Sequence, residues 1–186
     1  MKSRLVQIIL CLSALLCGPI LAADPQDTAA KCRTEMESEF GSLSELVDAA
    51  LELDIRVQQA EGSHTITLYK GDTKIGAVST AEPGPDGYSV TIDVRVERGF
   101  LGMGYGAVLF LLSAVVSAER WDCGLRLNFV RSDDAFKAWV NLYVEGIAEQ
   151  YPIPIPPHFN FRIRREMISE LDLFDKIRHR LKNQEP

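Results

Sequence analysis

The sequence predicts a layered α/β fold (α+β), in which a sheet is flanked by helices. Residues 88–96 alternate strictly between apolar and polar side chains, which is the period-2 pattern of a strand with one dry face. A glycine-rich corner follows at Gly99, Gly102, Gly104 and Gly106, and an apolar helix comes next. A strand, a glycine corner and a helix in this order aim backbone N–H groups and the positive end of a helix at a phosphate.

The segments before this strand predict two helices and a hairpin. Residues 28–40 are helix-prone and acidic. Ser42 and Glu45 have the spacing of a capping box for a second helix, whose leucine, valine and alanine residues recur on one face. Strands are predicted at residues 64–70 and 73–79, and a Gly-Asp turn joins them.

The segments after the corner predict further alternation of helices and strands. Alternating apolar residues indicate strands at residues 125–129 and 159–164. Between them, a helix is predicted over residues 132–146, and residues 151–157 are extended because their prolines exclude a helix. Residues 166–182 have the pattern of an amphipathic C-terminal helix.

A membrane span is the alternative interpretation of the apolar helix. Residues 100–117 carry no charge, and 18 such residues are the lower limit for a span. The glycines of the corner suit a loop, however, which leaves only Tyr105 to about Ala118 as helix. A core helix covered on all sides would be equally apolar. We therefore predict no transmembrane span in the mature chain.

The N-terminus has the pattern of a secretory signal peptide. Lys2 and Arg4 precede an apolar run, and the small residues Ala22 and Ala23 follow before Asp24. The predicted organisation is a signal peptide at 1–22, one domain at 23–165 and a helical extension at 166–186. We expect a secreted or periplasmic protein, with an uncleaved membrane anchor as the alternative. Removal of residues 1–22 would change the formal net charge from −6 to −8, which disfavours nucleic acid as a partner.

Other reactive side chains leave alternatives open. Cys32 and Cys123 could form a disulfide in an oxidising compartment, or they are two unpaired thiols. No metal-ligand spacing links the three histidines, so no metal site is predicted; they are His64, His158 and His179. Three arginines near the last strand could meet a phosphate or an acidic substrate, or form a solvated strand face; they are Arg162, Arg164 and Arg165.

Two blocks carry a resemblance to a known family. They are VRVERGFLGMGYGAVLF at residues 94–110 and LRLNFVRSDDAFKAWVNLYVEGI at residues 125–147. With the order of the elements, they resemble the GNAT (acyl-CoA N-acyltransferase) superfamily over roughly residues 28–163. The resemblance implies a mixed, mostly antiparallel sheet and an acetyl-CoA or other acyl-CoA cofactor. It also implies backbone contacts to the cofactor from Val96, Arg98, Gly99, Gly102, Met103, Gly104, Tyr105 and Gly106.

The two blocks depart from the family pattern. The family loop reads Q/R-x-x-G-x-G/A, and its basic position falls on Gly99 or on Leu101, according to the register chosen. The family's second block ends in a pattern like Y-x-x-x-G-F, whose tyrosine often protonates the departing thiolate. The residue four before Gly146 is Leu142, and Tyr143 stands one place later, about 100° around a helix.

Acyl transfer to an amine requires a base and a stabilised oxyanion. Asp93 and Glu97 are the candidate bases, because they lie on or beside the strand that leads to the corner. Tyr143 is the candidate proton donor, and a backbone N–H of the strand is the candidate oxyanion donor. The alternative for Asp93 is an ion pair with Arg95 on a wet sheet surface.

We therefore expect a secreted GNAT-like protein that transfers an acyl group from acyl-CoA to an unidentified small-molecule or protein amine. Exported compartments hold little acetyl-CoA. The protein would then act inside another cell, use a different acyl donor, or have lost catalysis. In the last case it would be an inactive binding or structural module of the cell envelope. The C-terminal helix offers a possible surface for a protein partner.

Overall fold

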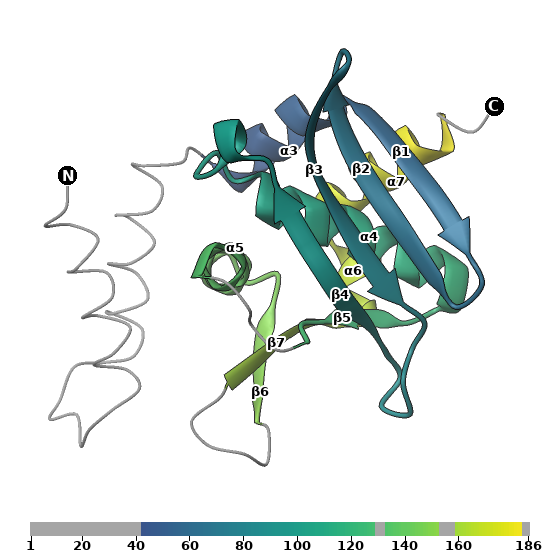
Figure 1. Ribbon diagram of the computed structural model, residues 1–186. Helices are drawn as coiled ribbons and strands as arrows, with labels where there is room; N and C mark the ends of the chain where they lie inside the picture. The colour runs from purple at the N-terminus through teal and green to yellow at the C-terminus, as the bar shows by residue number, and fades with distance from the viewer. Residues whose placement is uncertain (1–41, 129–132, 153–158, 184–186) are drawn as a thin grey trace, which may run out of the picture.

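One sheet of seven strands organises the protein (Figure 1). The structure is a computed structural model, and it describes residues 42–128, 133–152 and 159–183. The strands are β1 Asp54–Ala60, β2 Ser63–Lys70, β3 Thr73–Ala81, β4 Tyr88–Val96, β5 Gly124–Arg126, β6 Glu149–Pro152 and β7 Phe159–Ile163. Their order is β1-β2-β3-β4-β5-β7-β6, and only the β4–β5 pair is parallel. The predicted fold class, a mixed and mostly antiparallel sheet flanked by helices, is confirmed.

The helices agree with the sequence patterns in most places. They are α3 Leu43–Leu51, α4 Tyr105–Trp121, α5 Asp133–Val144, α6 Arg165–Glu170 and α7 Asp172–Lys182. The capping box is present, because the Ser42 hydroxyl accepts from the Glu45 amide and the Glu45 carboxylate accepts from the Ser42 amide, both at 3.2 Å. The helix predicted over residues 28–40 and the signal peptide lie outside the described residues.

The C-terminal amphipathic segment is two helices, not the one that was predicted. Leu171 has extended backbone angles, φ −96° and ψ 126°, and separates α6 from α7. The Phe174 amide donates to the Leu171 carbonyl at 2.9 Å, so the second helix starts afresh from this residue. Leu171 is half-buried and packs against the core, which explains why the chain bends there.

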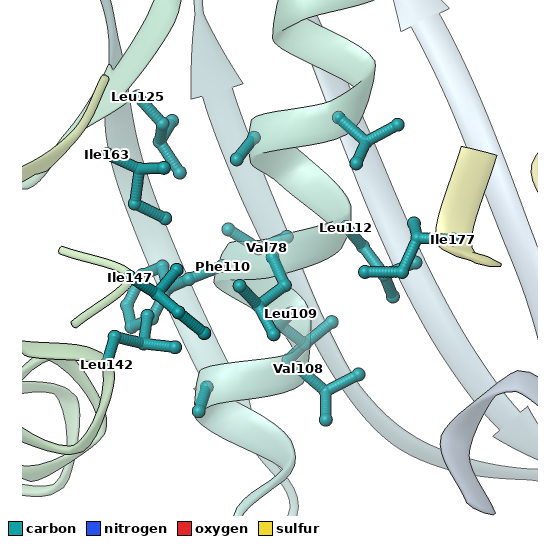
Figure 2. Packing of buried hydrophobic residues seen from close by; sticks show 14 of the residues in the cluster. Val78, Val108, Leu109, Phe110, Leu112, Leu125, Leu142, Ile147, Ile163 and Ile177 are labelled. Carbon is teal, nitrogen blue, oxygen red and sulfur yellow. The ribbon is translucent and has the colours of Figure 1, made fainter. Parts of the chain in front are cut away.

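α4 lies at the centre of the core. Every residue from Ala107 to Ala118 is buried, because the sheet covers one side of α4 and α3, α5, α6 and α7 contact its other sides. Figure 2 shows side chains of this helix meeting Val78 from β3, Leu142 from α5 and Ile177 from α7. Among the described residues, no helix has both the length and the apolar character that crossing a membrane requires.

The alternation of β4 changes face part-way along the strand. Ser89 and Thr91 are buried, whereas Ile92 is half exposed. The register with β3 shifts here, and Ile92 is the extra residue of a β-bulge. A bulge moves the side chains that follow it to the other face, so Val94 and Val96 pack against the core. The prediction of one continuous dry face is therefore wrong. The apolar and polar residues alternate without a break in the sequence, but the bulge at Ile92 changes the face to which the apolar residues point.

A polar cluster crosses the core between β2, β3 and α4. The Ser113 hydroxyl oxygen lies 3.2 Å from His64 Nε2 and 2.5 Å from Thr80 Oγ1, and all three residues are buried. The His64 ring packs against Trp121, with ring centroids 5.2 Å apart. Burial, with a smaller contribution from the Arg120 charge, lowers the pKa of His64 to about 4. His64 is therefore neutral in the folded protein at neutral pH.

Cys123 is buried and has no disulfide partner among the described residues. Its sulfur lies 2.9 Å from the Ser89 hydroxyl oxygen and donates to the Ser117 carbonyl at 3.7 Å. Cys32 lies outside the described residues, so its pairing with Cys123 stays a prediction.

α7 docks on the protein's own core. Its apolar face is buried and consists of Phe174, Ile177 and Leu181. Lys176 Nζ lies 2.8 Å from an Asp48 carboxylate oxygen in α3, and Arg180 Nε donates to the Leu51 carbonyl at 2.7 Å. The apolar face of the C-terminal helix is thus used within the chain, and a protein partner would have to contact its polar side.

Candidate functional site

β4 and β5 run side by side for only three residues. The parallel register pairs residues 88–90 with residues 124–126. Beyond this point the chain continues along β7, where the Leu127 amide donates to the Phe161 carbonyl at 2.9 Å. In the part of the chain that the structure describes, residues 91–96 of β4 therefore have no strand partner on the β5 side.

Two backbone N–H groups point into this unpaired edge of β4. The Glu97 amide donates to the Ile75 carbonyl of β3 at 2.8 Å. Because successive amides of a strand point to opposite sides, the N–H groups of Val96 and Val94 point away from β3. Val96 was a predicted cofactor contact. Val94 was missed, because the direction of its amide depends on a strand register that the sequence does not specify.

Two left-handed glycines shape the corner between β4 and α4. A 3₁₀ turn, η1 (Arg98–Phe100), follows the strand. Gly102 then has φ +77° and Gly104 has φ +80°, a region that glycine enters without steric cost. Gly104 is the N-cap of α4, and Gly106 lies in the first turn of the helix. The motif register that uses Gly102 and Gly104 as its loop glycines fits this backbone.

The corner presents N–H groups without acceptors. Among the described residues, no acceptor is found for the amides of Gly102, Gly104, Tyr105 and Gly106. Helices leave their first N–H groups unpaired, and the helix dipole adds about half a positive charge at that end. The Met103 amide differs, because it donates to the Phe100 carbonyl at 3.4 Å. The corner therefore has unpaired amide donors on either side of Met103, at the positive end of α4.

One side of the corner is open and the other is closed. A Cβ atom added to Gly99 or Gly102 would meet no atom within 4 Å. A Cβ atom added to Gly104 would lie 2.3 Å from Leu46 Cδ2 of α3. A ligand can therefore reach the backbone at Gly99 and Gly102, whereas α3 supports the corner from behind at Gly104.

Apolar side chains surround the open side. Leu101 and Met103 are 45% and 53% exposed and lie two residues apart in the corner. The Tyr105 ring packs edge-on against Phe100, with centroids 6.1 Å apart. These side chains give the rim of the corner an apolar surface next to its amide donors.

The charged residues Asp93 and Arg95 of β4, and Glu97 just after the strand, alternate with Val94 and Val96 and so lie on the opposite face. Asp93 and Arg95 are exposed and Glu97 is half-buried. No ion pair joins Asp93 to Arg95 in the described structure. Asp93 and Glu97 are four residues apart, about 13 Å along a strand, so they cannot both act on one reacting atom. Glu97 directly precedes η1 and the exposed Arg98, so it is the carboxylate that adjoins the corner.

α5 places a leucine where the family motif has its tyrosine. Leu142, four residues before Gly146, is completely buried, whereas Tyr143 is 42% exposed. The Tyr143 ring lies 5.9 Å from the Phe161 ring of β7. Gly146 ends the helix with φ +72°, and the Ile147 amide donates to the Leu142 carbonyl at 2.9 Å, which fixes this register.

Tyr143 lies more than a helical turn from the part of α5 that contacts the corner. A Cβ atom on Gly106 would lie 3.3 Å from the Ala138 Cβ, so α5 passes close to the first turn of α4. Tyr143 is five residues further along α5, about 7.5 Å along the helix axis. Glu97 and the glycine corner are thus contiguous, and Tyr143 stands apart, next to β7.

Comparisons with known proteins give only remote similarities. No protein-family model matches the chain, and no curated protein matches it. A crystal structure of a Bacillus subtilis acetyltransferase in complex with CoA aligns with 60% of this chain and 98% of its own, at 13% identity and a TM-score of 0.44. A GNAT-family acetyltransferase from Staphylococcus aureus aligns with 78% of this chain and 82% of its own, at 11% identity and a TM-score of 0.41. Similarity this low carries no argument for activity, so the site is described from the geometry of the chain.

Proposed function

We propose that the protein is a GNAT-like N-acyltransferase that binds acetyl-CoA or another acyl-CoA and transfers the acyl group to an amine. The observation that carries this proposal is the set of unpaired amide donors at the glycine corner, at the positive end of a 17-residue helix. A pyrophosphate suits such a corner, because its oxygens accept several N–H bonds at once.

The residues of the site fit an acyl-CoA. The amides of Gly102, Gly104, Tyr105 and Gly106 would hold the pyrophosphate, and Arg98 would add a positive charge. The Val94 and Val96 amides form an unpaired strand edge, which suits the extended, amide-bearing arm of CoA. When bound, an acyl-CoA supplies an acyl group activated as a thioester.

The side chains of β4 supply the remaining chemistry. In this proposal the Glu97 carboxylate accepts a proton from the incoming ammonium group, directly or through a water molecule. The Val96 N–H donates to the oxygen of the reacting carbonyl. Asp93 lies further along the strand and would contact the acceptor. Tyr143, the predicted proton donor, stands apart from Glu97 and the corner, so the proposal gives it no step and the departing thiolate takes its proton from solvent.

Calorimetric titration with acetyl-CoA tests the binding step. We expect a micromolar Kd for the unmodified protein. Gly99→Asp should weaken binding by about tenfold or more, because a carboxylate beside the pyrophosphate adds repulsion in a position with open space. Gly99→Asn is the matched control, since it adds the same volume without the charge. Absence of heat at about 1 mM ligand, or equal losses in both variants, would contradict the proposal.

Release of free thiol in the presence of a panel of amines tests catalysis. Glu97→Gln should lower kcat by about a hundredfold and leave the Kd for acetyl-CoA unchanged, because it removes the base without removing a cofactor contact. An unchanged kcat would exclude Glu97 as the base.

A second candidate function is an inactive GNAT-like binding or structural module of the cell envelope. The burial of Leu142 at the place of the family tyrosine favours it. This candidate predicts acetyl-CoA binding without thiol release for any amine.

We also place the protein outside the cytoplasm of the producing cell, on the evidence of the basic and apolar pattern in residues 1–22. N-terminal sequencing of the exported protein tests this location. A mature N-terminus near residue 23 is expected, and a protein that keeps Met1 in the cytoplasm would contradict it.

A further inference from the structure

A second polar surface lies on the sheet face opposite α4, at the start of β4. Leu125 and Ile163 are buried in the core beside α4 (Figure 2). Side chains alternate faces along a strand, so Arg126 and Arg162 project from the other side of the sheet. We call this surface the arginine face; it consists of Tyr88, Arg126, Tyr151, Arg162 and Arg164, with the carboxylates of Asp86 and Glu149.

Arg162 is held between two tyrosine rings at the centre of the arginine face. Its guanidinium carbon lies 5.1 Å from the Tyr88 ring centroid and 5.4 Å from the Tyr151 ring centroid. The Tyr88 ring lies over Gly124 of β5, where an added Cβ atom would be 2.7 Å from the ring. A side chain at this position would collide with the Tyr88 ring, so glycine is needed here. The Tyr88 and Tyr151 rings orient the Arg162 guanidinium before any ligand binds.

The arginine face places like charges opposite one another. Arg126 and Arg162 are direct cross-strand partners in the β5–β7 register. Opposed like charges destabilise a sheet. Three carboxylates offset these charges: Asp86 and Glu149 pair with the arginines, and the charge of Glu166 also acts on Tyr88 of this surface. Two opposed guanidinium groups kept on one exposed sheet face, at a structural cost, point to an anionic ligand.

The ion-pair distance recorded for each arginine of this face runs from its Nε atom. Arg162 Nε donates to Glu149 Oε1 at 2.6 Å, and Arg164 Nε lies 3.3 Å from Glu149 Oε2. Arg126 Nε lies 2.7 Å from Asp86 Oδ2. No hydrogen bond from the terminal Nη atoms of these arginines is found within the described residues. The side chains are 24–48% exposed, so these donors are accessible.

We infer that the arginine face binds an oxyanion, either a carboxylate or a phosphate group of a ligand. Paired N–H donors of a guanidinium match the two oxygens of such a group, and bonds of this kind are charge-assisted. Of the three arginines noted in the sequence, Arg165 does not belong to this site, because its Nε donates to Asp122 at 2.8 Å. The site is separate from the glycine corner, since the eight steps from Tyr88 to Val96 span about 26 Å.

Titration of the full-length protein with citrate and, separately, with inorganic phosphate tests the inference. The arginine side-chain N–H signals are followed by NMR in protein that carries Gly99→Asp, which weakens binding at the corner, and shifts at Arg126, Arg162 and Arg164 report on the arginine face. We expect saturable binding of one or both ions at millimolar concentration. Citrate alone would identify a carboxylate ligand, and phosphate alone a phosphorylated one. No saturable binding of either ion at about 10 mM would overturn the inference.

Substitutions locate the binding. Arg164→Gln and Arg126→Gln should each weaken it by about tenfold, because each removes charge-assisted donors without emptying the tyrosine sandwich. Arg56→Gln is the matched control. Arg56 also pairs with a carboxylate and stacks on a tyrosine, but it lies on β1 at the far edge of the sheet. Equal affinities in all three variants would show that only net charge matters, and the inference would fail.

Discussion

Alanine substitutions along the glycine corner should have sharply different effects on stability. Gly99 has no left-handed backbone and open space around it, so Gly99→Ala should change the free energy of unfolding by less than about 1 kcal/mol. Gly102 also has open space but φ +77°, so Gly102→Ala should cost about 1–2 kcal/mol of backbone strain. Gly104 combines φ +80° with the 2.3 Å overlap on Leu46, which adds about 1–3 kcal/mol.

Urea denaturation, monitored by circular dichroism, measures the free energy of unfolding of each glycine variant. The overlap term has its own test, because Leu46→Ala removes the atoms that the new Cβ would strike. In the Leu46→Ala background, Gly104→Ala should then cost only the strain of about 1–2 kcal/mol. The reasoning is refuted if Gly104→Ala costs no more than Gly102→Ala, or if Leu46→Ala leaves its cost unchanged. A cofactor-binding test at Gly104 would be confounded by this loss of stability, which is why Gly99 is the better position.

Three further predictions concern the core. The pKa of His64 is about 4 when folded and near 6.5 when unfolded, so the unfolded chain binds more protons between these values. The contribution of His64 to the free energy of unfolding should therefore be complete above about pH 6.5 and fall by at most about 3 kcal/mol as the pH drops to about 4. His64→Gln should flatten this pH dependence, which urea titrations at several pH values would measure. Ser113→Ala should cost about 2–3 kcal/mol, because it leaves Thr80 and His64 without their shared partner; an unchanged urea midpoint would contradict the hydrogen-bond assignment. Phe174→Ala should cost about 3–5 kcal/mol in thermal unfolding, because this residue is completely buried, and a negligible loss would show that α7 is dispensable.

The features that could be predicted from the sequence depend on neighbouring residues. Ser42 and Glu45 form their capping box within one turn, and Gly146 ends α5 through bonds to the preceding turn. The strand, corner and helix around Gly102 and Gly104 were also predicted, because glycine at a left-handed position leaves a clear mark on the sequence.

The features that were missed depend on contacts between distant segments. β1 is an edge strand with mostly exposed side chains, so its short alternation of Ile55 and Val57 gave only a weak pattern. β6 was expected only as part of an extended segment, since its pairing with β7 is not visible in the sequence. The bulge at Ile92 and the break at Leu171 are set by packing against neighbouring elements.

The candidate site divides in the same way. The unpaired amides of the corner follow from local backbone conformation, but the sequence pattern did not show that the Met103 amide donates to the Phe100 carbonyl. The free edge of β4 follows from the early separation of β5, which requires the three-dimensional register. The direction of the Tyr143 side chain follows from the burial of its neighbour Leu142 in the core, which turns Tyr143 toward the surface.

The docking of α7 on α3 has a consequence for biosynthesis. The Lys176–Asp48 contact joins residues that are 128 positions apart. Until α7 has emerged from the ribosome, the surfaces of α3 and α4 that it contacts lack its cover. The nascent polypeptide must therefore remain incomplete and vulnerable to proteases or self-association until its distal segment is released. Under the export that we propose, such a delay would keep the chain in a form that can still be threaded through a narrow channel.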